Sequence, residues 1–175
     1  SVCVGRSAVL KRVPSNYYDE PLSWRQKALG AHSMDHLCKS MVLENTHCIH
    51  SDCHDRFNSR YYCVVLQYVS KLSSEKLARF VRKTLSKGKV SKSSFNFRLA
   101  SPADALQLTG YINNAVTPVG MLHPIPVILS QSIVDLQPSS LWLGGGEVDL
   151  KLRVQVDEFR RVFDPFITDV TISFS

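Results

Sequence analysis

The sequence predicts an α+β fold in which a mixed, twisted and barrel-like β-sheet is flanked by short helices within a single domain. Three observations support this class. The chain has 175 residues, which is the size of one domain. Its predicted strands are many and short, and its few helices fall between them without regular strand–helix alternation. The interior contains no repeat and no low-complexity linker that would divide the chain.

The first half of the chain contains one predicted helix and two predicted strands. A proline opens a helix over residues 21–29, and Gly30 suits its end. Residues 37–43 alternate in the way that is typical of a strand. A polar, turn-rich loop over residues 45–60 follows. Residues 61–69 are apolar on both faces, so we expect a strand at the centre of the sheet.

The next predicted element is a helix that Ser73 or Ser74 caps and Gly88 ends. Its apolar residues recur at helical spacing on one face. A second, short helix opens with a Ser-Pro-Ala-Asp cap at residues 101–104 and ends at Gly110. The remaining predicted elements are a loop over 111–124, strands over 125–129, 140–143, 147–154 and 167–174, and a helix over 157–163.

We assign residues 1–20 to an N-terminal extension and residues 21–175 to the domain. Hydrophobic residues make up 44% of the chain and charged residues 21%, which is ordinary globular usage. Every apolar run is shorter than the ~20 residues that a membrane helix needs. The five cysteines are too few for a secreted disulfide framework, and the chain does not open with a signal-peptide pattern. We therefore expect a cytoplasmic protein with reduced thiols and no membrane partner.

Positive charge is concentrated in one segment. Between residues 71 and 98, nine Lys and Arg face a single Glu, whereas the whole chain carries a net charge of only +6. A basic stretch on a slightly acidic body is typical of nucleic-acid binding, although a solvated helix face rich in lysine gives the same pattern. The candidate nucleic-acid contacts in this segment are Lys76, Arg79, Arg82, Lys83, Lys87, Lys89 and Lys92.

Metal and nucleophile chemistry are weakly indicated. His, Cys and Asp gather between residues 47 and 55, but their spacing matches no standard zinc motif, and the zinc-deaminase signature is absent. The G-x-S-x-G elbow of a serine nucleophile is also absent. We therefore predict no metal, and keep a zinc-stabilised interaction module as the third possibility. Its ligands would come from His47, Cys48, His50, Cys53 and His54.

Three features have the composition of a binding site. Lys39 shares one side of its strand with apolar residues, so it either extends to the sheet edge or sits in a pocket with an anion. Residues 144–146 are three glycines that either form a tight turn or let a ligand approach the backbone. The loop over 109–121 combines amides, a proline and apolar residues. We expect it to pack on the domain and present backbone N–H groups, as an oxyanion or carbonyl site requires.

Four groups of residues occur in a recognisable order. They are Cys-Lys-Ser-Met-Val at 38–42, Ser-Pro-Ala-Asp at 101–104, Thr-Gly-Tyr at 109–111 with Val-Thr-Pro-Val-Gly at 116–120, and Ile-Pro-Val-Ile-Leu at 125–129 with Leu-Trp-Leu-Gly-Gly-Gly-Glu at 141–147. Together they resemble the YbaK/prolyl-tRNA-synthetase-associated editing domain family, in a eukaryotic free-standing branch. The first group resembles the strand that carries the family's key lysine, and the third resembles its G-x-x-x-P loop. The resemblance spans residues 24–163.

The resemblance implies an aminoacyl-tRNA deacylase that hydrolyses the ester of a mischarged tRNA, with alanine or cysteine on a proline-type tRNA as expected substrates. Family members typically use neither a metal nor an enzyme nucleophile, so we expect no cofactor. The partners would be tRNA and an aminoacyl-tRNA synthetase. The implied catalytic positions are Lys39, Gly110, Asn114, Thr117, Pro118 and Gly120. The implied substrate-binding positions are Asn113, Ala115, Val116, Gly144, Gly145 and Gly146.

Two departures from the family pattern bear on activity. Many members have two glycines before the valine of the loop, where this chain has Asn114 and Ala115. The Cys/His segment around Cys48 is not part of the common core. A non-catalytic tRNA-binding or assembly domain is therefore the main alternative, and it predicts tRNA binding without deacylation.

Overall fold

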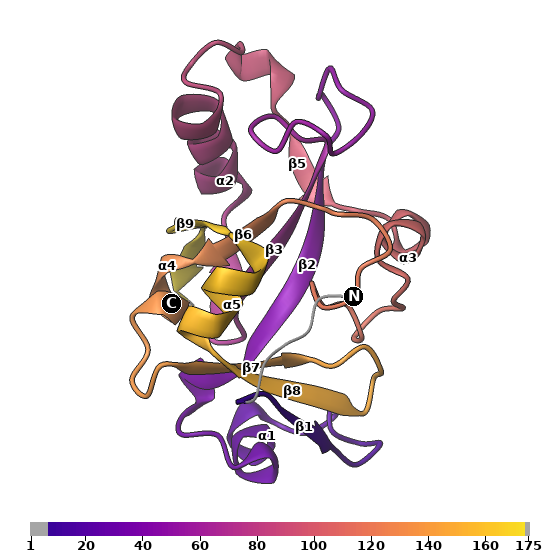
Figure 1. Ribbon diagram of the computed structural model, residues 1–175, viewed down its shortest axis with the longest axis vertical. Helices are drawn as coiled ribbons and strands as arrows, with labels where there is room; N and C mark the ends of the chain where they lie inside the picture. The colour runs from indigo at the N-terminus through magenta and orange to yellow at the C-terminus, as the bar shows by residue number, and fades with distance from the viewer. Residues whose placement is uncertain (1–6, 174–175) are drawn as a thin grey trace.

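A five-stranded mixed sheet forms the centre of the molecule (Figure 1). The structure is a computed structural model and describes residues 7–173. β5, β2 and β3 pair antiparallel, whereas β3, β6 and β9 pair parallel. β3 lies at the centre, as its apolar sequence predicts. In sheet order the strands are β5 (Phe97–Leu99), β2 (Cys38–Asn45), β3 (Tyr61–Gln67), β6 (Val127–Ser130) and β9 (Phe166–Thr168).

Two smaller antiparallel sheets complete the strand architecture. One has the order β1 (Val9–Arg12), β8 (Leu150–Gln155) and β7 (Ser140–Gly144), so part of the predicted N-terminal extension pairs with the domain. The other pairs β10 (Thr171–Ser173) with β4 (Ser70–Leu72). The mixed sheet and single domain are confirmed, but among the described residues the sheets stay open and do not close into a barrel.

Short helices flank the sheets, and the predicted caps are present. The side chains of Ser73 and Ser101 each accept a backbone N–H three residues on, and Gly30 and Gly110 end their helices with φ of 70° and 79°. α2 continues into one π-helical turn over Val81–Leu85. The α-helices are α1 (Leu22–Leu29), α2 (Ser74–Phe80), α3 (Pro102–Thr109), α4 (Gln131–Val134) and α5 (Val156–Phe163); 3₁₀ turns span Met34–His36 and Lys92–Ser94.

Both faces of the central sheet are buried. Cys63 and Val65 belong to the cluster that packs against α5 through Phe159. Val64 points to the other face and belongs to the cluster that includes Leu77 of α2. This two-sided burial explains why the sequence of β3 shows no polar face.

The C-terminal strand differs from its prediction. Residues 167–174 were expected to form one strand, but the chain breaks between β9 and β10, and Phe174 lies outside the described residues. The Asp169 carboxylate accepts the Thr171 N–H at 3.0 Å and pairs with Lys76 at 2.6 Å. This turn moves the chain from β6 to β4.

Other differences concern short segments. β8 begins at Leu150 because residues 147–149 complete the turn, where the Leu150 N–H reaches the Glu147 carbonyl at 3.1 Å. β1, β4, β5 and α4 were not predicted, since three or four residues are too few for a periodic pattern.

Candidate functional site

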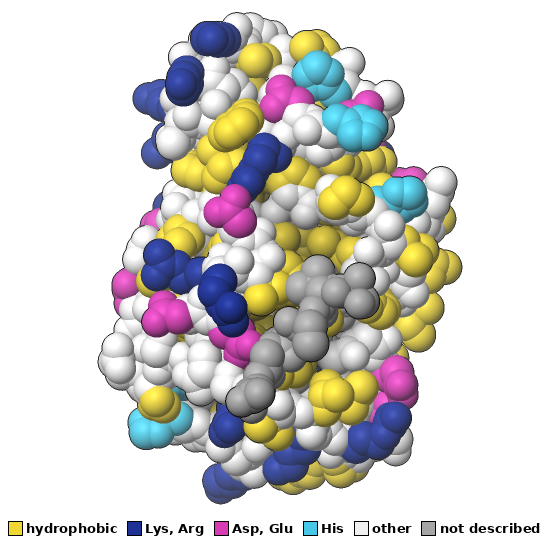
Figure 2. All heavy atoms as spheres, viewed as in Figure 1, with side chains coloured by type: hydrophobic (Ala, Val, Ile, Leu, Met, Phe, Trp, Pro, Cys, Tyr) yellow, Lys and Arg dark blue, Asp and Glu magenta, His cyan; other side chains and the backbone are white. Residues whose placement is uncertain are grey.

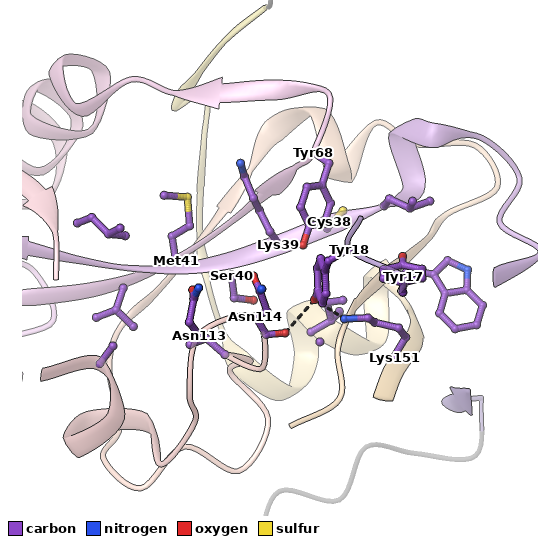
Figure 3. A pocket seen from close by; sticks show the side chains of 18 of the residues that line it. Tyr17, Tyr18, Cys38, Lys39, Ser40, Met41, Tyr68, Asn113, Asn114 and Lys151 are labelled. Atoms are coloured by element: carbon purple, nitrogen blue, oxygen red, sulfur yellow. Dashed lines mark hydrogen bonds between the residues drawn. The ribbon is translucent and has the colours of Figure 1, made fainter. Parts of the chain in front are cut away.

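A cavity of about 370 Å³ lies where several segments of the chain meet. Its walls are the first half of β2, the segment before α1, the loop after α3, and the hairpin of β7 and β8 (Figure 3). The end of α1, Tyr68 after β3, and the chain from β5 into α3 complete the lining. Of the predicted site residues, the cavity brings together Lys39, Asn113, Asn114, Val116 and Gly144. Its lining contains no His, Asp or Glu among the residues that the structure describes.

β2 places alternate side chains on opposite sides of the sheet edge. Figure 3 shows Lys39 and Met41 on one side of the strand, and Ser40 on the other side, toward the asparagines. Lys39 is half-buried, and its Nζ lies 5.4 Å from the centre of the Tyr68 ring. Burial lowers the pKa of Lys39. No carboxylate of the described chain lies within ion-pair distance, so the ammonium is available to an external anion. Lys39 thus contributes to the rim of the cavity, across β2 from the loop.

Ser40 carries an unpartnered polar atom. Its Oγ is buried and has no hydrogen-bond partner among the described residues. Because a buried hydroxyl without a partner is costly, Ser40 is a polar group of the lining whose hydrogen bonding the described chain does not complete. The sequence drew attention to Lys39 and not to its neighbour, since an unsatisfied hydroxyl is visible only in three dimensions.

The loop after α3 is held in a defined shape, as its composition predicts. The Tyr111 hydroxyl donates to the Val119 carbonyl at 2.5 Å, closing the loop on itself. Gly110 and Gly120 both have positive φ, at 79° and 70°. A Cβ at Gly120 would lie 2.9 Å from the Tyr111 hydroxyl. These two predicted site glycines therefore shape the loop and do not line the cavity.

The middle of the loop divides into an exposed tip and a buried base. Asn113 and Asn114 are exposed at the cavity, and Asn114 has a positive φ of 64°. Ala115, Thr117 and Pro118 are buried beneath them and do not line the cavity. The amides and the proline therefore occupy different layers of the loop.

The three glycines of the β7–β8 turn serve different purposes. A Cβ at Gly144 would meet the Val116 carbonyl oxygen at 3.0 Å, so a glycine there lets the loop approach β7. Cβ atoms at Gly145 and Gly146 would meet Leu150 and Tyr111, respectively, and neither residue lines the cavity. The close backbone approach expected at this turn is made at Gly144 by the chain's own loop.

The sequence did not single out Lys151, which lines the same cavity. Lys151 is only 4% exposed, and its Nζ contacts the Tyr18 hydroxyl and lies 4.3 Å from the centre of that ring. Burial, with a further contribution from Arg25, lowers the pKa of Lys151 to about 8. Lysine is rarely buried to this degree, and the sequence of β8 alone gives no sign that this residue points inward.

The cysteine- and histidine-rich loop does not assemble a metal site. Across residues 7–173, no group of three or more His, Cys, Asp or Glu is placed to hold a metal ion. His54 pairs with Asp52 at 3.2 Å, and His47 Nδ1 lies 2.9 Å from the Ser93 carbonyl oxygen. A second, open cavity of about 520 Å³ lies beside this loop.

The basic segment forms a surface at one end of the molecule. Figure 2 shows Lys and Arg side chains gathered at the upper left of the view, where Figure 1 draws α2. Two of the predicted contacts are engaged internally, because Lys76 pairs with Asp169 and Arg79 with Glu75. The other five have no carboxylate within ion-pair distance among the described residues. We call these five the basic surface: Arg82, Lys83, Lys87, Lys89 and Lys92.

Comparison with family models decides the relationship. Residues 27–162 match the model of the aminoacyl-tRNA editing domain, which is most of the chain. The chain belongs to the aminoacyl-tRNA editing domain family. The resemblance of its sequence motifs is thereby confirmed. No curated protein matches the chain in sequence.

Solved structures share the fold of this editing domain. A protein proposed to be a trans-editing enzyme for prolyl tRNA synthetase superposes with a TM-score of 0.72 at 19% identity, over 95% of this chain and 87% of its own. A hypothetical protein reaches 0.69 at 18% identity, over 97% and 94%. A scaffold protein from computational epitope grafting reaches 0.72 at 17%, over 95% and 88%. At these identities the similarity shows the fold alone.

None of the helices within residues 7–173 combines the length and the apolar content that a membrane crossing requires. 

Proposed function

We propose that this editing domain is a cytoplasmic aminoacyl-tRNA deacylase that hydrolyses the ester of a mischarged tRNA without a metal. Alanine and cysteine on proline-type tRNA are the substrates to test first. The supporting observation is that Lys39, then Asn113, Asn114 and Val116 of the loop, and Gly144 all line the same cavity. Its volume of about 370 Å³ is within the range of small-ligand sites.

In the proposed reaction, water adds to the ester carbonyl carbon and a tetrahedral oxyanion forms. The bond to the ribose oxygen of the terminal adenosine then breaks, and that oxygen takes up a proton. An aminoacyl ester is already activated, so positioning and stabilisation of the oxyanion supply most of the catalysis. Lys39 would hold the terminal phosphate or the developing charge, and the loop backbone and the Ser40 hydroxyl would hold the aminoacyl group.

The cavity favours water over an enzyme nucleophile. Cys38 is the thiol that lines it, and burial raises the pKa of Cys38. The reactive form of cysteine is the thiolate, so this residue is poorly suited to attack. Ser40 has no histidine or carboxylate beside it in the lining to accept its proton.

The basic surface would attract the tRNA body. Its five cations have no internal carboxylate partners, so their charge is available to phosphate. A synthetase that charges the same tRNA would be a natural partner, because it would supply the mischarged substrate.

Deacylation of a panel of mischarged tRNAs tests this proposal. We expect hydrolysis of at least one member, with alanyl- and cysteinyl-tRNA of the proline type included. Lys39→Ala should slow it by about 10²–10³-fold, the range for loss of one group that stabilises developing charge. Lys27→Ala, an exposed lysine of α1 outside the cavity, is the matched control and should keep the full rate.

Two other outcomes separate the alternatives. Hydrolysis that EDTA abolishes would restore a metal mechanism. Salt-dependent tRNA binding with no hydrolysis across the whole panel would reject the enzyme and favour a non-catalytic tRNA-binding domain.

A further inference from the structure

Lys151 has an unusual environment for a lysine. It is buried at 4% exposure on β8, and among the described residues no carboxylate lies within ion-pair distance of its Nζ. Asp149 is the nearest acidic influence, but its carboxylate pairs with Arg12 at 2.9 Å. The Lys151 ammonium instead faces two aromatic rings, with Nζ 5.1 Å from the centre of the Tyr17 ring and 4.3 Å from that of Tyr18. Removing the ammonium group from water costs free energy, and buried charged groups of this kind are concentrated at functional sites.

Lys151 begins a short chain of hydrogen bonds that ends in the loop. Its ammonium donates to the Tyr18 hydroxyl. A hydroxyl has one hydrogen, and that of Tyr18 goes to the Asn114 carbonyl oxygen at 2.8 Å (Figure 3). Because the ammonium can only donate, it fixes the direction of the chain and strengthens the hydroxyl as a donor. Lys151 therefore contacts the loop through Tyr18 and not directly.

The Tyr18 hydroxyl makes a long-range contact to a residue in the left-handed region. The φ of Asn114 is 64°, a conformation that asparagine tolerates better than most residues with a side chain. Its side chain is exposed, and the local turn is closed by the Ala115 N–H, which donates to the Ile112 carbonyl at 3.0 Å. The hydroxyl of Tyr18 contacts the peptide group between Asn114 and Ala115, and both Tyr18 and Asn114 line the cavity.

The segment that carries Tyr18 is itself firmly held. The Arg25 guanidinium donates to the Tyr18 carbonyl at 2.6 Å and to the Glu20 carbonyl at 2.7 Å. The Tyr17 side chain is only 3% exposed. Tyr18 precedes the residues that match the family model, which begin at residue 27. A rigid segment outside the matched core thus forms one wall of the cavity.

We propose that Lys151 and Tyr18 are positioning residues, with Lys151 acting through Tyr18 to set the Asn114 carbonyl for the aminoacyl group of the substrate. The proposal rests on the deacylase function proposed above. It makes the segment before α1 part of the active site, although the family model does not cover that segment. The Asn114 carbonyl oxygen is an acceptor, and the free α-amino group of an aminoacyl ester is the donor that would meet it.

A double-mutant cycle tests the chain of contacts. Tyr18→Phe and Lys151→Met should each lower kcat for deacylation by about tenfold or more, with KM for tRNA changed less than twofold. Because Lys151 acts through Tyr18, the double variant should be no slower than Tyr18→Phe alone. Independent, multiplicative losses would overturn the proposal, and so would unchanged kcat in either single variant.

The Asn114 carbonyl ¹³C chemical shift tests the same claim without a substrate. It should change in Tyr18→Phe and, in the same direction, in Lys151→Met. Tyr62→Phe is the matched control, because the Tyr62 hydroxyl is also buried and donates to a backbone carbonyl, that of Arg56, far from the cavity lining. An unchanged shift in Tyr18→Phe overturns the positioning role. If no tRNA is deacylated but the shifts change as expected, the proposed function fails while the positioning of the loop stands.

Discussion

At the scale of single residues, close packing around the cavity restricts which residue types fit at particular positions. Gly144 lacks a side chain because a Cβ would lie 3.0 Å from the Val116 carbonyl oxygen. Asn114 takes a left-handed conformation, which glycine adopts most easily and asparagine tolerates, and its carbonyl oxygen accepts the Tyr18 hydroxyl. Asparagine is therefore compatible with the backbone at this position, where many family members have glycine.

The burial of Lys151 should make the free energy of unfolding depend on pH. Its pKa is about 8 in the folded state against an ordinary 10.5. Below pH 8 the lysine is charged in both states, and the folded state bears the full desolvation cost. Between pH 8 and 10.5 the unfolded chain binds more protons, so stability rises with pH and the cost disappears.

Lys151→Met should therefore stabilise the protein at pH 7, by roughly 1–3 kcal/mol once lost cation–π contacts are subtracted from the pKa effect. The gain should shrink toward zero above pH 10. Urea unfolding at pH 7 and pH 10 measures this, with exposed Lys27→Met as the control. A stability difference that is the same at both pH values would contradict the buried charge.

At the scale of elements, local signals located β2, α3 and the loop, but not the residues that reach the cavity from elsewhere. Ser101 and Gly110 mark the ends of α3 in the sequence, and the alternation of β2 identified Lys39. Tyr18 and Lys151 meet only because β1 and β7 flank β8 and bring the N-terminal segment alongside. Contacts between residues 133 positions apart leave no periodic signal in one sequence, so they could not be predicted.

The basic surface should affect tRNA binding and leave the chemical step unchanged. Lys83→Ala combined with Lys89→Ala removes two exposed charges from it. The slope of log affinity against log salt should fall by about 1–2 units, and KM should rise while kcat at saturating tRNA stays the same. The control is Lys27→Ala with Arg160→Ala, two exposed cations elsewhere. Equal effects of the two pairs would mean that tRNA does not use the basic surface.

At the scale of the whole molecule, the basic surface and the cavity are formed by different parts of the fold. Figure 1 places α2 at one end of the long axis and the β7–β8 hairpin toward the other, with the central sheet between them. A mixed sheet in one domain was predictable from short strands and interspersed helices. Its open edges were not predictable, because closure into a barrel depends on strand pairing that the sequence does not state. The open edge of β2 beside Lys39 is where the cavity forms.

Binding of a hydrolysis-resistant mimic of the substrate end tests the central claim most directly. The probe is adenosine carrying alanine at the 3′ position through an amide in place of the ester, titrated into ¹⁵N-labelled protein. We expect shift changes to converge on Lys39, Ser40, Asn113, Asn114 and Gly144, with residues of the second cavity, such as Cys53 and His54, unaffected. Saturable binding that leaves the backbone signals of Lys39 and Asn114 unmoved would show that the aminoacyl end binds elsewhere, and would contradict the account.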